Sequence, residues 1–92
     1  MRIKVLIPAY FRHLTAEKAE ILCAVPTAKA NLKHLFDELE KLHPGLKSAV
    51  FGSDGRPKRF SGLLINSRPY QNIYAELVDN DIVEVTSVVV QE

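Results

Sequence analysis

The chain has 92 residues, of which 47% are hydrophobic, and this suffices for one small domain over 1–92 with a single core. Its 12 basic and 11 acidic residues give a formal net charge of +1, so charge offers no argument for nucleic acid or an anionic membrane as a partner. The one cysteine excludes an internal disulfide, and we expect a cytoplasmic protein.

The first predicted element is a strand at Arg2–Ile7, with its apolar residues on one face. Charged residues interrupt this stretch, so we expect neither a signal peptide nor a membrane span here. Ala9–Thr15 is expected to connect it to a second strand at Lys18–Ala24, and a hairpin is the simplest pairing. Cys23 is expected to be a buried structural thiol of this second strand.

A helix is predicted after Pro26, with Thr27 as its N-cap and without a capping box. One helical face is apolar and comprises Leu32, Leu35, Phe36, Leu39 and Leu42. On the opposite side, Lys33, Asp37 and Lys41 are spaced as a ladder of i,i+4 pairs. The helix is expected to end near Leu42, because His43, Pro44 and Gly45 follow.

The middle of the chain predicts short elements. In chain order they are a helical turn at Leu46–Phe51, a loop at Gly52–Lys58, a strand at Phe60–Ile65 and a short return strand at Arg68–Tyr70. Residues 73–78 read either as a 3₁₀ turn or as a connection. Asp79–Asp81 is then a turn whose middle residue, Asn80, tolerates a left-handed backbone.

The last predicted strand, Ile82–Val90, is rich in β-branched residues. Val83 and Val85 are expected to face the core, while Glu84 and Thr86 face the other way. Because this strand is the most continuously apolar, we expect it in the interior of the sheet, parallel to the first strand. The predicted fold class is α+β, with a mixed sheet of four to five strands packed on one main helix.

No group of residues combines an acid, a base and an electrophile, so we expect no catalytic residue, no cofactor and no self-sufficient enzyme. His13, His34 and His43 lack the spacing of metal ligands, and no metal site is expected. Aromatic and basic residues occur together, but the small net charge favours core aromatics with flanking surface charges over a nucleic-acid site. These residues are Tyr10, Phe11, Arg12, Lys58, Arg59 and Phe60.

Several segments follow a family pattern in order and spacing. They are an opening strand at Met1–Pro8 followed by Phe11-Arg12, the helix with its Pro44-Gly45-Leu46 stop, the strand Phe60–Asn66, and the turn and strand Leu77–Val83. In this pattern the chain resembles the ubiquitin-fold (β-grasp) sulfur carriers of the MoaD/ThiS family, which include the small subunit of molybdopterin synthase and the thiamine- and cysteine-biosynthesis carriers. Asn80 stands where that family usually has a turn glycine, a conservative replacement for this backbone.

The resemblance implies that function resides at the C-terminal end. In the family, a ubiquitin-activating-type enzyme adenylates the carboxylate of a Gly-Gly tail, and sulfur transfer then gives a thiocarboxylate. Here Gln91 and Glu92 occupy the two glycine positions. Their side chains oppose the close approach that glycine permits, and the charge of Glu92 would face the ATP phosphates.

Two hypotheses follow. The first is a MoaD/ThiS-like, non-catalytic protein-binding or regulatory module that uses its sheet face and valine-rich end. The alternative is a sulfur carrier for molybdopterin, thiamine or cysteine biosynthesis. A third possibility is an unrelated role, since a fold does not fix a function.

The expected partner is a protein, either a ubiquitin-activating-type adenylating enzyme or a protein like the large subunit of molybdopterin synthase. Neither a nucleic acid nor a membrane is expected as a partner. The residues expected to bind it are Tyr10, Phe11, Val88 and Val90, on the reasoning that exposed apolar side chains carry interfaces. For Phe11 and Val88 the alternative is a place in the core.

Overall fold

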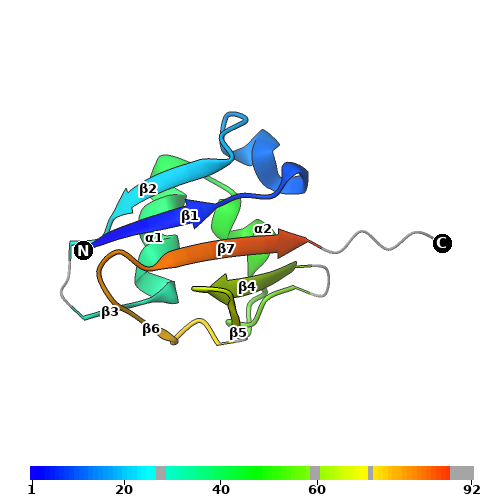
Figure 1. Ribbon diagram of the computed structural model, residues 1–92. Helices are drawn as coiled ribbons and strands as arrows, with labels where there is room; N and C mark the ends of the chain where they lie inside the picture. Colours follow the sequence, from blue (N-terminus) through cyan, green and yellow to red (C-terminus); the bar gives the residue numbers. More distant parts are fainter. Residues whose placement is uncertain (27–28, 59–60, 71, 88–92) are drawn as a thin grey trace.

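The computed structural model describes residues 1–26, 29–58, 61–70 and 72–87. Two parallel strands form the centre of its main sheet, β1 (Arg2–Leu6) and β7 (Ile82–Ser87). The sheet has five strands in the order β2-β1-β7-β4-β5 (Figure 1). The prediction that the last strand lies inside the sheet and parallel to the first is therefore confirmed.

Antiparallel strands flank this parallel pair. The hairpin partner of β1 is β2 (Glu20–Ala24), with Val5 opposite Ile21 in the register. On the other side, β4 (Ser61–Ile65) pairs with β7 and then with the short edge strand β5 (Arg68–Tyr70). A parallel pair together with antiparallel neighbours makes a mixed sheet, as predicted.

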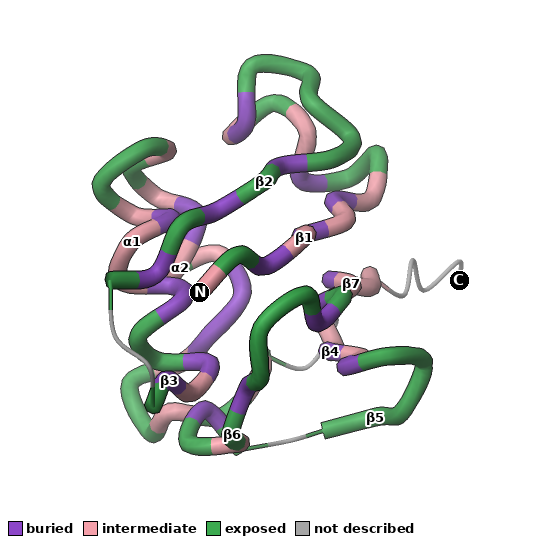
Figure 2. The backbone as a smooth tube through the Cα atoms, turned by 60° about the vertical axis from the view of Figure 1, so that its left-hand side comes forward, coloured by how far each residue is buried: buried purple, intermediate pink, exposed green. Residues whose placement is uncertain are grey.

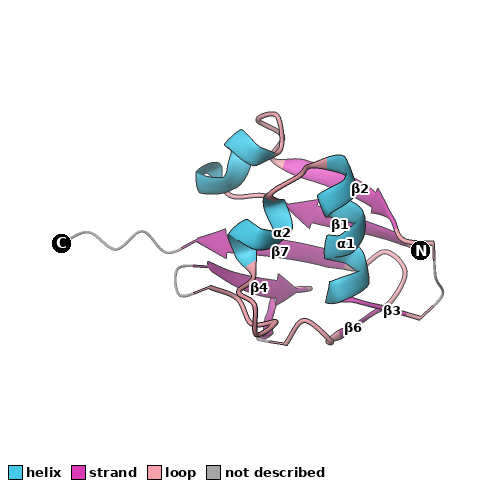
Figure 3. Cartoon of the chain, turned by 180° about the vertical axis from the view of Figure 1, so that it is seen from behind, coloured by secondary structure: helices cyan, strands magenta, loops and turns pink. Residues whose placement is uncertain are grey.

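The helices cover one face of this sheet (Figure 3). The main helix, α1, spans Leu32–Leu42, and the short α2 spans Leu46–Val50. Four side chains of α1 are fully buried against the strands, and burial of such side chains stabilises a fold by about 1.5–3 kcal/mol each. They are Leu32, Leu35, Phe36 and Leu39. This is the β-grasp arrangement of a helix held by a mixed sheet, so the predicted fold is confirmed.

Burial alternates along the strands as their pattern predicted (Figure 2). Val83 and Val85 are buried in β7, whereas Glu84 and Thr86 between and beyond them are only partly buried. Cys23 is 1% exposed. Its place in the core confirms the expected structural role in packing.

Leu42 was predicted to lie on the buried face of α1. This prediction is wrong, because Leu42 is 60% exposed. The helix ends at this residue, and the chain reverses at Gly45, whose φ is +95°. Leu46, the first residue of α2, is fully buried beyond the turn. At this end of the core, Leu46 of α2 therefore occupies the buried position that was predicted for Leu42.

The predicted start of the helix is also wrong. The N-cap is Asn31, whose side chain accepts a hydrogen bond from the amide of His34 at 3.0 Å. In return, His34 Nδ1 accepts the amide hydrogen of Asn31 at 3.2 Å, which completes a capping box. Thr27, the predicted N-cap, lies outside the described residues.

A second, two-stranded sheet explains why α1 begins late. Ala30–Asn31 (β3) pairs antiparallel with Glu76–Leu77 (β6), which keeps the chain extended up to the residue before the helix. The pairing also resolves the ambiguous stretch at 73–78, which contains a short strand. Sequence spacing gave no signal for such a long-range pair, because two residues are too few for a period.

The connection after β1 is a 3₁₀ helix, η1 (Ala9–Leu14). A tight turn follows, in which Ala16 and Glu17 both have positive φ, 53° and 64°. The second strand consequently begins at Glu20 rather than at the predicted Lys18. None of the helices in the described residues is long and apolar enough to cross a membrane.

Candidate functional site

The C-terminal end of β7 is the first feature of the candidate site. Because β1 and β7 are parallel, they end at the same edge of the sheet, and η1 follows β1 directly at that edge (Figure 1). Ser87, the last described residue, pairs with Ser61 of β4. The last described residue of β7 is thus held by β4, and η1 lies at the same edge of the sheet.

The expected site residues fall into two groups. Val88, Val90, Gln91 and Glu92 lie outside the described residues. Tyr10 and Phe11 lie in η1, with their rings in a T-shaped contact 5.1 Å apart between centroids. Tyr10 is 61% exposed, and its role in partner binding stays a prediction.

Phe11 does not have the exposure that the partner-binding prediction required. It is 5% exposed and belongs to the hydrophobic core. The reason is that the 3₁₀ turn directs these two consecutive side chains differently, one into the core and one outward. The alternative prediction, a core position, is correct for Phe11.

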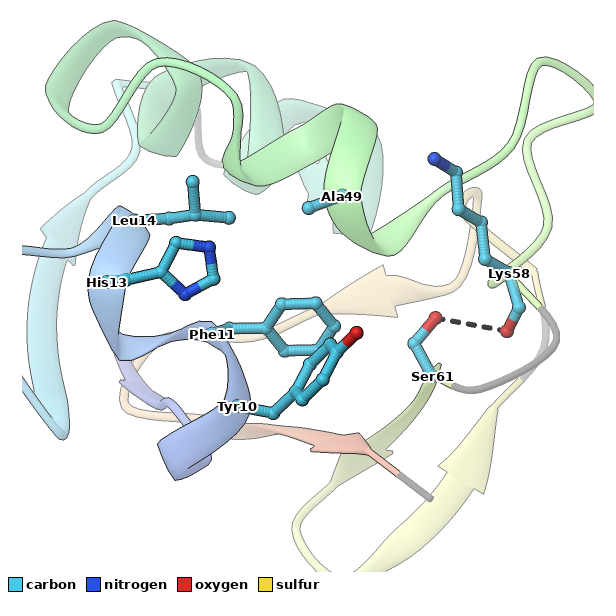
Figure 4. A pocket seen from close by; sticks show the side chains of 7 residues that line it. All are labelled: Tyr10, Phe11, His13, Leu14, Ala49, Lys58 and Ser61. Atoms are coloured by element: carbon cyan, nitrogen blue, oxygen red, sulfur yellow. Dashed lines mark hydrogen bonds between the residues drawn. The ribbon is translucent and has the colours of Figure 1, made fainter. Parts of the chain in front are cut away.

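A pocket of about 340 Å³ lies beside these rings (Figure 4). Three separate segments form it, namely η1, α2 and the start of β4. Its lining comprises Tyr10, Phe11, His13, Leu14, Ala49, Lys58 and Ser61. Tyr10, Phe11 and Lys58 were noted in the sequence, but His13 and Ala49 gave no signal that would join them to these residues.

The outer face of the sheet carries a second apolar feature. Leu22 on β2 and Ile82 on β7 are each opposite Lys4 of β1 in the strand register, so the three side chains form one row. Leu22 is 71% exposed and Ile82 is 41% exposed. Lys4 pairs with Glu20 at 3.4 Å, which directs its charge toward the next row. Two exposed aliphatic residues therefore border one cation on this face.

Among the described residues, the remaining candidate groups do not assemble into a metal centre. In the described part of the chain, no three His, Cys, Asp or Glu side chains lie close enough to hold a metal ion. His34 is used in the capping box of α1. Burial, together with the nearby charge of Glu38, raises the pKa of the Cys23 thiol above its ordinary value, which makes it less reactive.

Solved structures resemble this fold over its whole length. A chain of the Amycolatopsis orientalis BexX/CysO complex matches with a TM-score of 0.82 and 20% identity, over 98% of this chain and 99% of the other. SAMP1 from Haloferax volcanii matches with a TM-score of 0.83 and 20% identity, over 100% of both chains. At this identity the two likenesses show the fold.

A closer relation in sequence comes from Pyrococcus furiosus. The protein assigned there as molybdopterin converting factor, subunit 1, is 31% identical and has a TM-score of 0.76, over 97% of this chain and 99% of that one. This chain belongs to the MoaD/ThiS-like family. A scan of protein-family models and a search of curated proteins gave no match.

For a MoaD/ThiS-like chain, the family resemblance directs attention to the end of β7. The structure fixes this end at Ser87 by its pairing with Ser61. The MoaD/ThiS-like chain also presents Tyr10 at the same edge of the sheet.

Proposed function

We propose that this chain is a protein-binding module of the MoaD/ThiS-like family that contacts its partner with the tail end of the sheet. The observation that carries the proposal is the 61% exposure of Tyr10 beside the end of β7. Large aromatic side chains are common interface anchors, since they bury much area at little entropic cost. Val88 and Val90 belong to the proposed interface as well.

The proposed partner is a protein, either a ubiquitin-activating-type adenylating enzyme or a protein like the molybdopterin synthase large subunit. Two structural neighbours support this choice, a complex of BexX with CysO and a subunit of a molybdopterin converting factor. We infer a cytoplasmic module that does not catalyse a reaction by itself and needs no cofactor of its own.

Gln91 and Glu92 favour binding over sulfur transfer. Both residues stand at the positions that the family resemblance assigns to glycine. A side chain at either position widens the tail, and the Glu92 carboxylate repels the phosphates of ATP during adenylation. The alternative function, a sulfur carrier, is supported by the carrier-like neighbours and differs from the first only in the fate of the terminal carboxylate.

One experiment separates the two functions. The protein is incubated with an adenylating enzyme from the same genome, ATP and a sulfur donor, and its intact mass is measured. The binding module keeps its mass, whereas a Gln91→Gly/Glu92→Gly variant gains the mass of sulfur in place of oxygen. A thiocarboxylate on the unaltered chain would establish the carrier function instead.

Binding itself is measured by calorimetry with the same enzyme. Tyr10→Asp and Val90→Asp should each weaken the interaction at least tenfold while leaving the melting temperature nearly unchanged. Tyr74→Asp is the matched control, because Tyr74 is 63% exposed but does not line the pocket beside η1. Equal affinities for all three variants would contradict the proposed interface.

A further inference from the structure

The pocket beside η1 has an apolar base. Phe11, Leu14 and Ala49 supply it, and Figure 4 shows the Phe11 ring and the Ala49 methyl group directed into the space between η1 and α2. A volume of about 340 Å³ exceeds that of a single large side chain. The pocket is therefore wide enough for an aromatic or branched aliphatic side chain from another molecule.

The rim of the pocket is polar and basic. The side chains of Tyr10, His13 and Lys58 are among its lining, and none of its lining residues is acidic. Among the residues that the structure describes, no side-chain hydrogen bond or ion pair engages these three groups. They remain available to a ligand.

The backbone on the Lys58 side of the rim is held firmly. The amide of Lys58 donates to the carbonyl oxygen of Val50 at 2.8 Å. The Ser61 hydroxyl lies 2.8 Å from that same oxygen and 3.1 Å from the Lys58 carbonyl oxygen (Figure 4). Such fixed geometry lowers the conformational entropy that the protein loses when a ligand binds.

We propose that this pocket receives an apolar side chain of the protein partner with a carboxylate next to it. The inference rests on the proposed function in one respect, namely that the natural occupant is a segment of a protein. The apolar base favours the ring or aliphatic group. The charge of Lys58 favours an acidic neighbour, because Lys58 makes no ion pair with a described residue, although Glu40 and Asp54 line the adjoining pocket with it. The exposed ring of Tyr10, which contacts Phe11 edge to face, would contact the occupant as well.

Short peptides test the pocket without the partner. We choose Ac-Phe-Glu-NH₂ and Ac-Glu-Phe-NH₂, with Ac-Phe-Gln-NH₂ as the uncharged control, and follow backbone amide shifts by ¹H–¹⁵N NMR at low salt. At least one acidic peptide should give saturable shifts at His13 and Ala49, with a Kd on the order of 1 mM for a single anchor. The glutamine peptide should bind roughly two- to fivefold more weakly, the ratio expected of an exposed ion pair.

Two variants assign the parts of the pocket. Lys58→Gln should remove the preference for the acidic peptide, while Lys41→Gln, which removes an equal charge from a lysine outside the pocket, should retain it. Ala49→Leu fills the pocket from within α2 and should weaken all peptides at least tenfold. Leucine suits a helix, and an unchanged NMR spectrum elsewhere would verify the fold.

Peptide shifts that are absent, or that map away from η1 and α2, would overturn the inference. Equal binding of the acidic and glutamine peptides would overturn its charged part. These outcomes are independent of the proposed function, since the adenylating enzyme can bind through the tail whether or not the pocket takes a side chain. Conversely, peptide binding in the pocket would stand even if the tail proved to carry sulfur.

Discussion

The side-chain amide of Asn66 donates from Nδ2 to Oδ1 of Asp81 at 2.8 Å. This bond joins the β4–β5 turn to the turn that precedes β7. Both side chains also accept a backbone hydrogen bond. Asn66 Oδ1 accepts from the amide of Ile82 at 2.9 Å, and Asp81 Oδ2 accepts from the amide of Val78 at 2.9 Å. The side chains of Asn66 and Asp81 thus fix the backbone at the start of β7.

Replacing Asp81 should therefore be costly. Asp81 is 6% exposed, and Asp81→Ala leaves the amide groups of Asn66 and Val78 without their partner, so we expect a loss of about 2–4 kcal/mol in the free energy of unfolding. Urea denaturation measures this loss. Asp54→Ala, which removes a carboxylate from an exposed loop, serves as the control and should cost much less. Similar losses for both variants would refute the role of the network.

The capping box of α1 gives a second prediction. Asn31→Ala should lower stability by about 1 kcal/mol, because the amide of His34 loses its acceptor at the end of the main helix. Asn31→Asp should retain most of the stability, since its carboxylate also accepts that hydrogen bond. Thermal unfolding followed by circular dichroism distinguishes the two variants. If Asn31→Ala left the stability unchanged, pairing between β3 and β6 alone would fix the start of the helix.

Gly62 gives a third prediction. It depends on the close approach of Thr86 to this position and not on a positive φ at the glycine. A methyl group at this position would lie 2.7 Å from Thr86 Oγ1 across the ladder between β4 and β7. Gly62→Ala should therefore cost about 1–3 kcal/mol, and adding Thr86→Ala should restore most of it. A double-mutant cycle in urea measures the coupling. Additive effects of the two changes would show that the strands move apart without strain.

Stability should also depend on the charge of Glu40. Its carboxylate accepts hydrogen bonds from the amides of Gly45 and Lys47, at 2.8 and 2.9 Å, and these bonds lower the pKa of Glu40 in the folded state. A lowered folded-state pKa means that the contribution is fully present above the unfolded value of about 4.3 and is lost as pH falls through the folded value.

The measurement is a series of urea denaturations of the protein and of Glu40→Gln from pH 7 to pH 3. The unaltered chain should be the more stable at pH 7, and the difference should shrink below about pH 4 as its carboxylate gains a proton. A difference that stays constant over the whole range would show that Glu40 acts through packing or neutral hydrogen bonds.

The main elements of the fold could be predicted because their signals are local. The alternation of Ile3 and Val5 marks a buried strand face, and the stripe from Leu32 to Leu39 marks a helix that must cover a sheet. Asn80 marked a left-handed turn, and its φ is 69°. The arrangement of the parallel central pair followed from the apolar character of the last strand.

The parts that could not be predicted depend on residues far apart in the chain. Thr27 was predicted as the N-cap because threonine is a common residue type there. Ala30 instead pairs with Leu77 in an extended strand, so the helix begins later and its N-cap is Asn31. Tyr10 and Phe11 are consecutive aromatic residues, yet Phe11 lies in the core and Tyr10 on the surface. Composition does not reveal which side of a 3₁₀ turn meets the sheet.

The candidate site divides in the same way. The family pattern and the presence of Gln91 and Glu92 can be read without a structure, because they depend on residue types in order along the chain. The pocket lined by His13, Ala49 and Lys58 cannot be read in this way, because it exists only in the folded protein. Their segments are brought together by the packing of η1 and α2 at the edge of the sheet, and long-range packing of this kind has no period that a sequence can show.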